Sequence, residues 1–172
     1  MDLSALLDNK SIKPKAKTET ISQWLLEKKL SPADLISFAE KAKDPAKATC
    51  IEGLEFATKK EAGIADKNCF LFVTKSLQAK APRVKWESAK VIANTAHLFK
   101  DKLDEAIKNL LDNSEHEGTV VRWSAAFALG EILKLKTKHN KTLLPAIEAI
   151  CKRDEKNSIR KLYLDAVRIV GA

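Results

Sequence analysis

The sequence has few of the residues that end helices, and few that build disulfide or metal frameworks. Its 172 residues include only five glycines and five prolines, which favours helices over a strand-rich fold with many turns. The three cysteines, Cys50, Cys69 and Cys151, are odd in number and far apart. Each falls on the apolar face of an expected helix, so we interpret them as buried free thiols in a reducing compartment. No Cys or His pair has metal-ligand spacing, and we expect neither a metal nor a cofactor.

Long apolar runs and catalytic motifs are also missing. No apolar run approaches the ~20 residues of a membrane-spanning helix, and the N-terminus lacks the apolar core of a signal peptide. A cytoplasmic location is therefore expected. The histidines, His97, His116 and His139, are widely separated with no nucleophile at a matching spacing, and there is no glycine-rich phosphate loop. The sequence predicts no catalytic residues and no enzyme activity.

The overall charge permits an acidic partner without requiring one. Hydrophobic residues make up 45% of the chain and charged residues 31%, which is typical of a soluble helical protein. The formal net charge is +8, of which residues 1–118 carry +2 and residues 119–172 carry +6. Nucleic acid, an anionic lipid surface or an acidic protein would therefore meet the C-terminal third first.

Four similar segments recur along the chain at a nearly constant interval. A cation stands second in each, at intervals of 38, 37 and 38 residues: Lys47, Lys85, Arg122 and Arg160. A second column is apolar: Leu54, Ile92, Leu129 and Val167. A third is small or β-branched, which lets neighbouring helices approach closely: Gly53, Val91, Ala128 and Ala166. We interpret these segments as the second helix of each of four units.

An amphipathic segment precedes each of these helices and is interpreted as the first helix of its unit. The predicted helix pairs occupy residues near 32–60, 66–98, 101–137 and 141–170, with an enlarged loop at 133–140. Ser31 is expected to cap the first pair. Pro145 is expected in the first turn of a helix that Thr142 caps, because a proline deeper inside would break the helix.

The N-terminal region is predicted to be a separate segment. Residues 1–17 read as a short leader followed by a basic linker that contains Lys10, Lys13, Lys15 and Lys17. A lone helix near 20–30 follows, with Thr20 and Gln23 as a capping box. Its Trp24 and Leu25 would cover the apolar end of the first pair, because terminal units of a stacked array need caps. Residues 18–172 are then one all-α domain.

The segment 119–133, TVVRWSAAFALGEIL, resembles the second helix of a HEAT repeat. It is similar to the short variant, found in bilin-lyase-like proteins, whose units read D-P-x-V-R-x-x-A-A-x-A-L-G-x-I. Pro82 to Lys85 match the start of that pattern, whereas Thr119 and Asn157 replace its proline. The resemblance covers about residues 31–172. It implies a right-handed α-α superhelix of four helix pairs plus a capping helix, with the second helices lining the concave side.

If Val121, Ala125 and Ala128 face the core, the opposite face of that helix presents Arg122, Trp123 and Phe127 to the concave side. The candidate ligand-binding residues, taken from three units, are Lys85, Trp86, Lys90, Arg122, Trp123, Phe127, Arg160 and Lys161. Tryptophan and arginine are enriched where binding energy concentrates. The alternative is a structural ladder, in which the cations pair with an acid or carbonyl of the adjacent unit.

Two further details belong to that ladder. Glu52 and Lys90 would pair across successive helices, and Trp86 would stack on Trp123.

A second surface is basic, and it combines the loop 134–141 with the following turn: Lys134, Lys136, Lys138, Lys141, Lys152, Arg153 and Lys156. This surface is either a phosphate or acidic-protein contact or a solvated loop.

The first hypothesis for function is a non-catalytic scaffold that holds a protein or peptide partner in its concave face, as most HEAT proteins do. The alternative is nucleic-acid binding, because HEAT-like alkylpurine DNA glycosylases are similar in lining a basic concavity with tryptophans. Those enzymes carry a catalytic aspartate one turn after an aromatic residue. Here Ala89 and Lys90 follow Trp86 at that distance, so the resemblance does not extend to glycosylase activity. The third hypothesis is a bilin lyase or chaperone, and it is based only on the similarity of the short repeat variant to such proteins.

Overall fold

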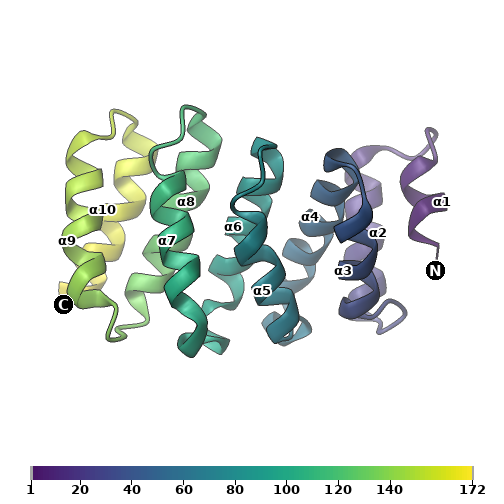
Figure 1. Cartoon of the computed structure of the whole chain (residues 1–172), viewed down its shortest axis with the longest axis horizontal. Helices are drawn as coiled ribbons and strands as arrows, with labels where there is room; N and C mark the ends of the chain where they lie inside the picture. Colours follow the sequence, from purple (N-terminus) through teal and green to yellow (C-terminus); the bar gives the residue numbers. More distant parts are fainter. Residues whose placement is uncertain (1, 172) are drawn as a thin grey trace.

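The computed structural model describes residues 2–171, and every regular element in this range is a helix (Figure 1). The α-helices are α1 (Leu3–Asp8), α2 (Pro14–Leu26), α3 (Pro32–Lys41), α4 (Asp44–Lys60), α5 (Lys67–Ser76), α6 (Pro82–Thr95), α7 (Leu103–Asn113), α8 (Thr119–Lys134), α9 (Asn140–Arg153) and α10 (Asn157–Gly171). Short 3-10 turns η1 (Ala62–Ile64), η2 (Ala96–Leu98) and η3 (Lys100–Lys102) join some of them. The predicted all-α fold is confirmed.

The helices after α1 form two layers (Figure 1). We call α2, α4, α6, α8 and α10 the inner helices, because successive members pack against one another extensively. We call α3, α5, α7 and α9 the outer helices, and successive members of this layer touch at few points or not at all. A stacked array curves toward its more closely spaced layer, so the inner helices lie on the concave side. The α-solenoid of four helix pairs is thus confirmed.

Small residues set the close spacing of the inner helices. Helix α2 lies so near α4 that a Cβ atom at Gly53 would stand 2.5 Å from Ile21 Cγ2. At the other end of the array, a Cβ at Gly130 of α8 would meet Ala166 Cβ of α10 at 3.4 Å. The apolar column at Leu54, Ile92 and Leu129 is fully buried between the layers. The repeat columns therefore correspond to the packing contacts of the core.

The N-terminal region differs from the prediction. Helix α2 begins at Pro14, because proline is favoured at the first helical position, so Lys15 and Lys17 lie in a helix and not in a linker. Leu3 and Leu6 of α1 are buried in the common core, and Lys17 Nζ donates a hydrogen bond to the Leu7 carbonyl. Helix α1 therefore packs onto the same array as the four pairs.

Two of the predicted helix caps are wrong and one is confirmed. Thr20 lies inside α2, where its hydroxyl donates to the Ala16 carbonyl at 2.8 Å instead of starting a helix. Helix α9 begins at Asn140, so Thr142 is not its cap, and Pro145 lies beyond the first turn. Proline has no backbone N–H, so the Lys141 carbonyl lacks its helical hydrogen bond. The loss is tolerated because Lys141 is exposed to water. Ser31 Oγ accepts a hydrogen bond from the Asp34 amide at 3.0 Å, as expected for a cap.

Within residues 2–171, no helix combines the length and the apolar character needed to cross a membrane.

Candidate binding surface on the inner helices

The repeated cation in the middle of the array ties neighbouring units together. Lys85 Nζ donates to the Leu77 carbonyl at 3.1 Å and to Asn113 Oδ1 at 3.0 Å. Leu77 follows α5 in the same unit, whereas Asn113 ends α7 in the next. Burial lowers the pKa of Lys85, and Asp112 opposes this shift. The ammonium group thus bridges the ends of two outer helices.

Arg122 makes the same kind of bridge one unit later. Its Nε donates to Asp154 Oδ2 at 3.1 Å, and Asp154 follows α9 in the next unit. One terminal nitrogen donates to the carbonyls of His116 and Glu117 at 3.1 and 3.0 Å. The Asp154 side chain is only 4% exposed, so this ion pair is largely shielded from water. Two of the four cations therefore form a structural ladder.

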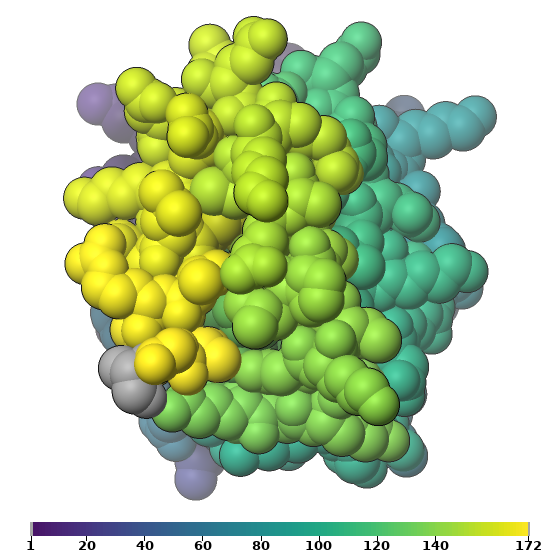
Figure 2. Space-filling view, turned by 90° about the vertical axis from the view of Figure 1, so that its left-hand side faces the viewer, coloured from purple at the N-terminus to yellow at the C-terminus, as the bar shows by residue number. Residues whose placement is uncertain are grey.

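The other two cations have no such partner. Within residues 2–171, neither Lys47 nor Arg160 makes a side-chain hydrogen bond or ion pair. Arg160 and Lys161 are exposed on α10, which with α9 forms the end of the array shown in Figure 2. Of the eight predicted ligand-binding residues, Lys85 and Arg122 are thus occupied by contacts within the protein, whereas Arg160 and Lys161 are exposed.

The predicted pair between Glu52 and Lys90 is wrong. Glu52 Oε2 accepts from Thr18 Oγ1 at 2.9 Å and from Arg83 at 2.7 Å. Lys90 pairs instead with Glu87, in its own helix, at 3.3 Å. Side chains that touch across neighbouring inner helices are 31 to 39 positions apart, from Arg83 with Glu52 to Asn94 with the Glu55 carbonyl. A contact is therefore not confined to equivalent positions of two repeats.

Trp86 and Trp123 are partly exposed, and their rings contact different partners. Trp123 stacks on Phe127 of the same helix, with ring centroids 5.6 Å apart and planes inclined by 27°. Trp86 donates its Nε1 hydrogen to Glu87 Oε1 at 2.9 Å, which fixes the orientation of its ring. Among the described residues the two indoles do not stack on each other, so the predicted stack between Trp86 and Trp123 is wrong.

Glu87 is the most buried of the charged residues named above, with 4% of the residue exposed. Burial raises the pKa of its carboxyl group, and the nearby Glu52 adds to this, whereas Lys90 and the Trp86 hydrogen bond oppose it. A carboxylate in this position is held by one indole N–H and one ammonium group.

We define the inner surface by the side chains that line the inner helices away from the outer layer: Glu52, Arg83, Trp86, Glu87, Lys90, Trp123, Phe127, Glu131 and Lys134. Its charges are paired, and Glu131 contacts Lys134 at 2.6 Å. The sequence analysis named Glu52 with another partner and did not count Glu87 or Glu131 among the binding residues. The available signal was an acid three residues before a cation, a spacing that places both on one helix face, in Glu87/Lys90 and Glu131/Lys134.

The predicted basic surface is divided in two. Its loop residues lie at the start of α9 and its turn residues at the end, and the 14 residues of this helix separate them by about 21 Å. Lys134 is paired with Glu131, and Arg153 with Glu115. Within residues 2–171, no three His, Cys, Asp or Glu side chains are grouped closely enough to hold a metal ion.

No protein-family model matches the chain, and no curated protein matches its sequence significantly. Solved structures are similar. One designed armadillo repeat protein matches with a TM-score of 0.70 at 14% identity, over 98% of this chain and 80% of that one. Another, in complex with the peptide (KR)4, matches with 0.71 at 18% identity over the same shares. A third, computationally designed for modular peptide recognition, matches with 0.69 at 17% identity over 97% and 80%. The fold of this chain is the helical-repeat solenoid of the HEAT and armadillo type.

Proposed function

We propose that the chain is a non-catalytic binding protein whose inner surface holds an extended segment of a protein partner. The observation that carries this proposal is the row of partly exposed aromatic rings on the inner helices. Trp86 lies on α6, and Trp123 and Phe127 lie on the adjacent α8. Such rings offer a large contact area at little cost in conformational entropy.

The rings are held in place before any partner arrives. Trp123 is stacked on Phe127, and the N–H of Trp86 is bonded to a buried carboxylate. Preorganised groups lose little freedom on binding, so more of the contact energy is retained as affinity. The paired charges beside them are of both signs. We therefore expect a partner segment that carries apolar side chains between residues of both charges.

The geometry gives less support to nucleic-acid binding. Lys85 and Arg122, the cations expected to contact phosphates, donate their hydrogen bonds to carbonyls, a carboxamide and a carboxylate of the protein itself. Lys90 and Lys134 are paired with glutamates. A peptide partner also agrees with the similar designed proteins, one of which is seen with a peptide in its structure.

The test uses linear peptides of random sequence, displayed on phage and selected on the immobilised full chain. We expect selected peptides to bind Trp123→Ala at least tenfold more weakly, because loss of a central aromatic contact costs about 2 kcal/mol or more. Leu71→Ala, on an outer helix, is the matched control and should bind normally. Equal affinity for wild type and Trp123→Ala would refute the assignment. So would preferential binding of an oligonucleotide with an affinity that falls steeply as salt increases.

A further inference from the structure

Successive outer helices differ in whether polar contacts join them. We call the boundary between two successive outer helices a seam, and among residues 2–171 the seam between α3 and α5 has no polar contact across it. Between α5 and α7, Asn109 donates to the Thr74 carbonyl and Asn113 to the Leu77 carbonyl, both at 3.1 Å. The units of α7 and α9 are joined by the ion pairs of Arg153 with Glu115 and of Arg122 with Asp154. Among the described residues, no hydrogen bond or ion pair connects α3 to α5.

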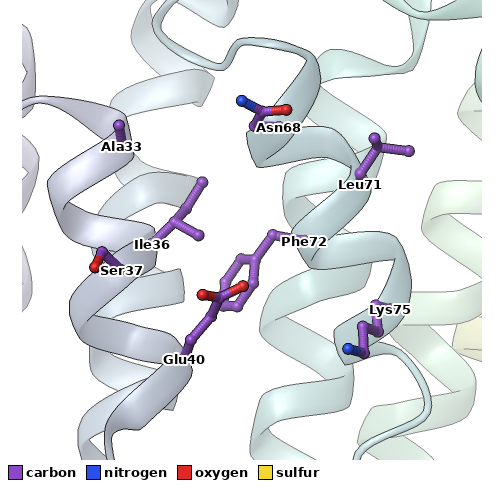
Figure 3. A pocket seen from close by; sticks show the side chains of 8 residues that line it. All are labelled: Ala33, Ile36, Ser37, Glu40, Asn68, Leu71, Phe72 and Lys75. Atoms are coloured by element: carbon purple, nitrogen blue, oxygen red, sulfur yellow. The ribbon is translucent and has the colours of Figure 1, made fainter.

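The repeat itself shows why this seam is open. Phe72 of α5 precedes Asn109 of α7 by 37 residues, which is the repeat interval, so the two side chains have equivalent positions. Asn109 reaches back to the preceding outer helix and bridges it. Phe72 cannot bridge, and in Figure 3 its ring points into the space between α3 and α5. This unit thus has an aromatic ring at the position where the next unit has the hydrogen-bonding side chain of Asn109.

The space beside Phe72 is a groove formed by two adjoining cavities of about 420 and 410 Å³. Both are lined by Phe72, Glu40 and Lys75. Ile36 of α3 and Leu71 of α5 form apolar walls of the first (Figure 3), and Leu71 is 41% exposed. We call this space the outer groove. It is large enough for bulky apolar side chains of a partner.

One end of the outer groove is positively charged. Lys47 lines the second cavity together with Lys75, against the single acid Glu40. In the next two units the counterparts of Lys47, which are Lys85 and Arg122, are bonded to residues at the end of the next outer helix. The ammonium groups of both Lys47 and Lys75 make no hydrogen bond or ion pair with the described residues. Two cations without partners next to an apolar groove are complementary to an apolar group followed by a carboxylate.

We propose that the outer groove binds a short amphipathic α-helix of a partner protein, with an Asp or Glu side chain placed beside Lys47 and Lys75. A helix satisfies its own backbone hydrogen bonds, so it can lie between two helices with only side chains in contact, and its apolar face can fill the groove. Each groove helix has ten residues, about 15 Å, which matches roughly three turns of a bound helix.

The test is a selection from a displayed library of helical peptides with a randomised apolar and charged face. We expect wild type to enrich peptides with apolar residues at i and i+3 or i+4 and an acid one or two turns away. A synthetic, fluorescein-labelled peptide of the enriched sequence should bind Leu71→Asp at least tenfold more weakly by anisotropy. The double change Lys47→Glu with Lys75→Glu should weaken it similarly, and a peptide with its acid changed to lysine should recover affinity for that double variant.

Matched controls separate this site from the inner surface. Lys67→Glu, at an exposed position of α5 outside the lining of the groove, and Trp123→Ala on α8 should leave binding unchanged. Circular dichroism must show that each variant is folded, and Leu71→Asp is preferred because this side chain is exposed. Phe72→Asn, which introduces the residue of the next unit, should also reduce binding. The proposal is overturned if no helix is enriched, if the enriched consensus is basic, or if Leu71→Asp binds normally. Self-association of the wild type that Leu71→Asp abolishes would assign the groove to a second copy of the chain instead.

Discussion

Replacing Arg122 by alanine tests whether the cation ladder holds the solenoid together. The change removes three hydrogen bonds and leaves the Asp154 carboxylate, 4% exposed, without its cationic partner. Breaking one side of a buried ion pair costs about 3–5 kcal/mol. Asp154 keeps a hydrogen bond from the Lys156 amide at 3.0 Å, and Arg122 is 19% exposed, so the lower figure of about 3 kcal/mol applies. For a chain of this size the melting temperature should fall by about 6–12 °C.

The assay is guanidinium denaturation followed by tryptophan fluorescence and circular dichroism. Trp123 is the neighbour of Arg122 and reports on this unit. Arg160→Ala is the matched control, since this exposed side chain of the same column has no partner among the described residues, and its replacement should change stability by less than ~0.5 kcal/mol. Adding Asp154→Asn to Arg122→Ala should recover part of the loss by removing the buried charge. If Arg122→Ala and Arg160→Ala lose the same stability, the ladder does not stabilise the fold.

Three further outcomes are expected. Gly53→Ala should cost about 1–3 kcal/mol in urea denaturation because its Cβ would overlap α2, whereas Gly63→Ala, which meets nothing within 4 Å, should change little. Glu87 has a pKa raised by burial, so its contribution to stability is fully present below the unfolded value near 4.5 and is lost as pH rises through the raised pKa. Glu87→Gln should therefore remove part of the stability decrease measured between pH 4 and 7, and an unchanged slope would contradict this. Burial raises the pKa of the Cys50 and Cys69 thiols to about 12, so iodoacetamide at pH 8 should label them only after unfolding, as mass spectrometry would show.

Most of the fold could be predicted from periodicity. The cation column at Lys47, Lys85, Arg122 and Arg160 located the second helices, and the apolar spacing before each located the first. This works because each unit must bury an apolar face against its neighbours, so the burial pattern is repeated in the sequence. The N-terminal boundary failed, because a run of lysines suggested a linker. In the structure Lys15 and Lys17 lie on a helix that starts at Pro14.

The candidate site was predicted less well. The sequence placed Trp86, Trp123 and Phe127 on the inner helices, and they do lie there partly exposed. The alternative of a structural ladder describes Lys85 and Arg122, which turn to the ends of outer helices. The sequence did not identify their acceptors, since these are carbonyls and side chains outside the repeat columns. It also gave a wrong partner for Glu52, because contacts between neighbouring inner helices span 31 to 39 positions and a repeat alignment does not say which of them forms.

The sequence by itself determined the number of helix pairs, their order and which faces are buried, since local apolar periodicity and small residues decide these. Only the tertiary structure decided which charges are paired, which rings remain accessible and which seam stays open. Those properties depend on the offset and distance between helices that are some thirty residues apart in the chain. Phe72 is an example. The sequence shows only an apolar residue of a helix, whereas the structure places its ring in the open groove between α3 and α5.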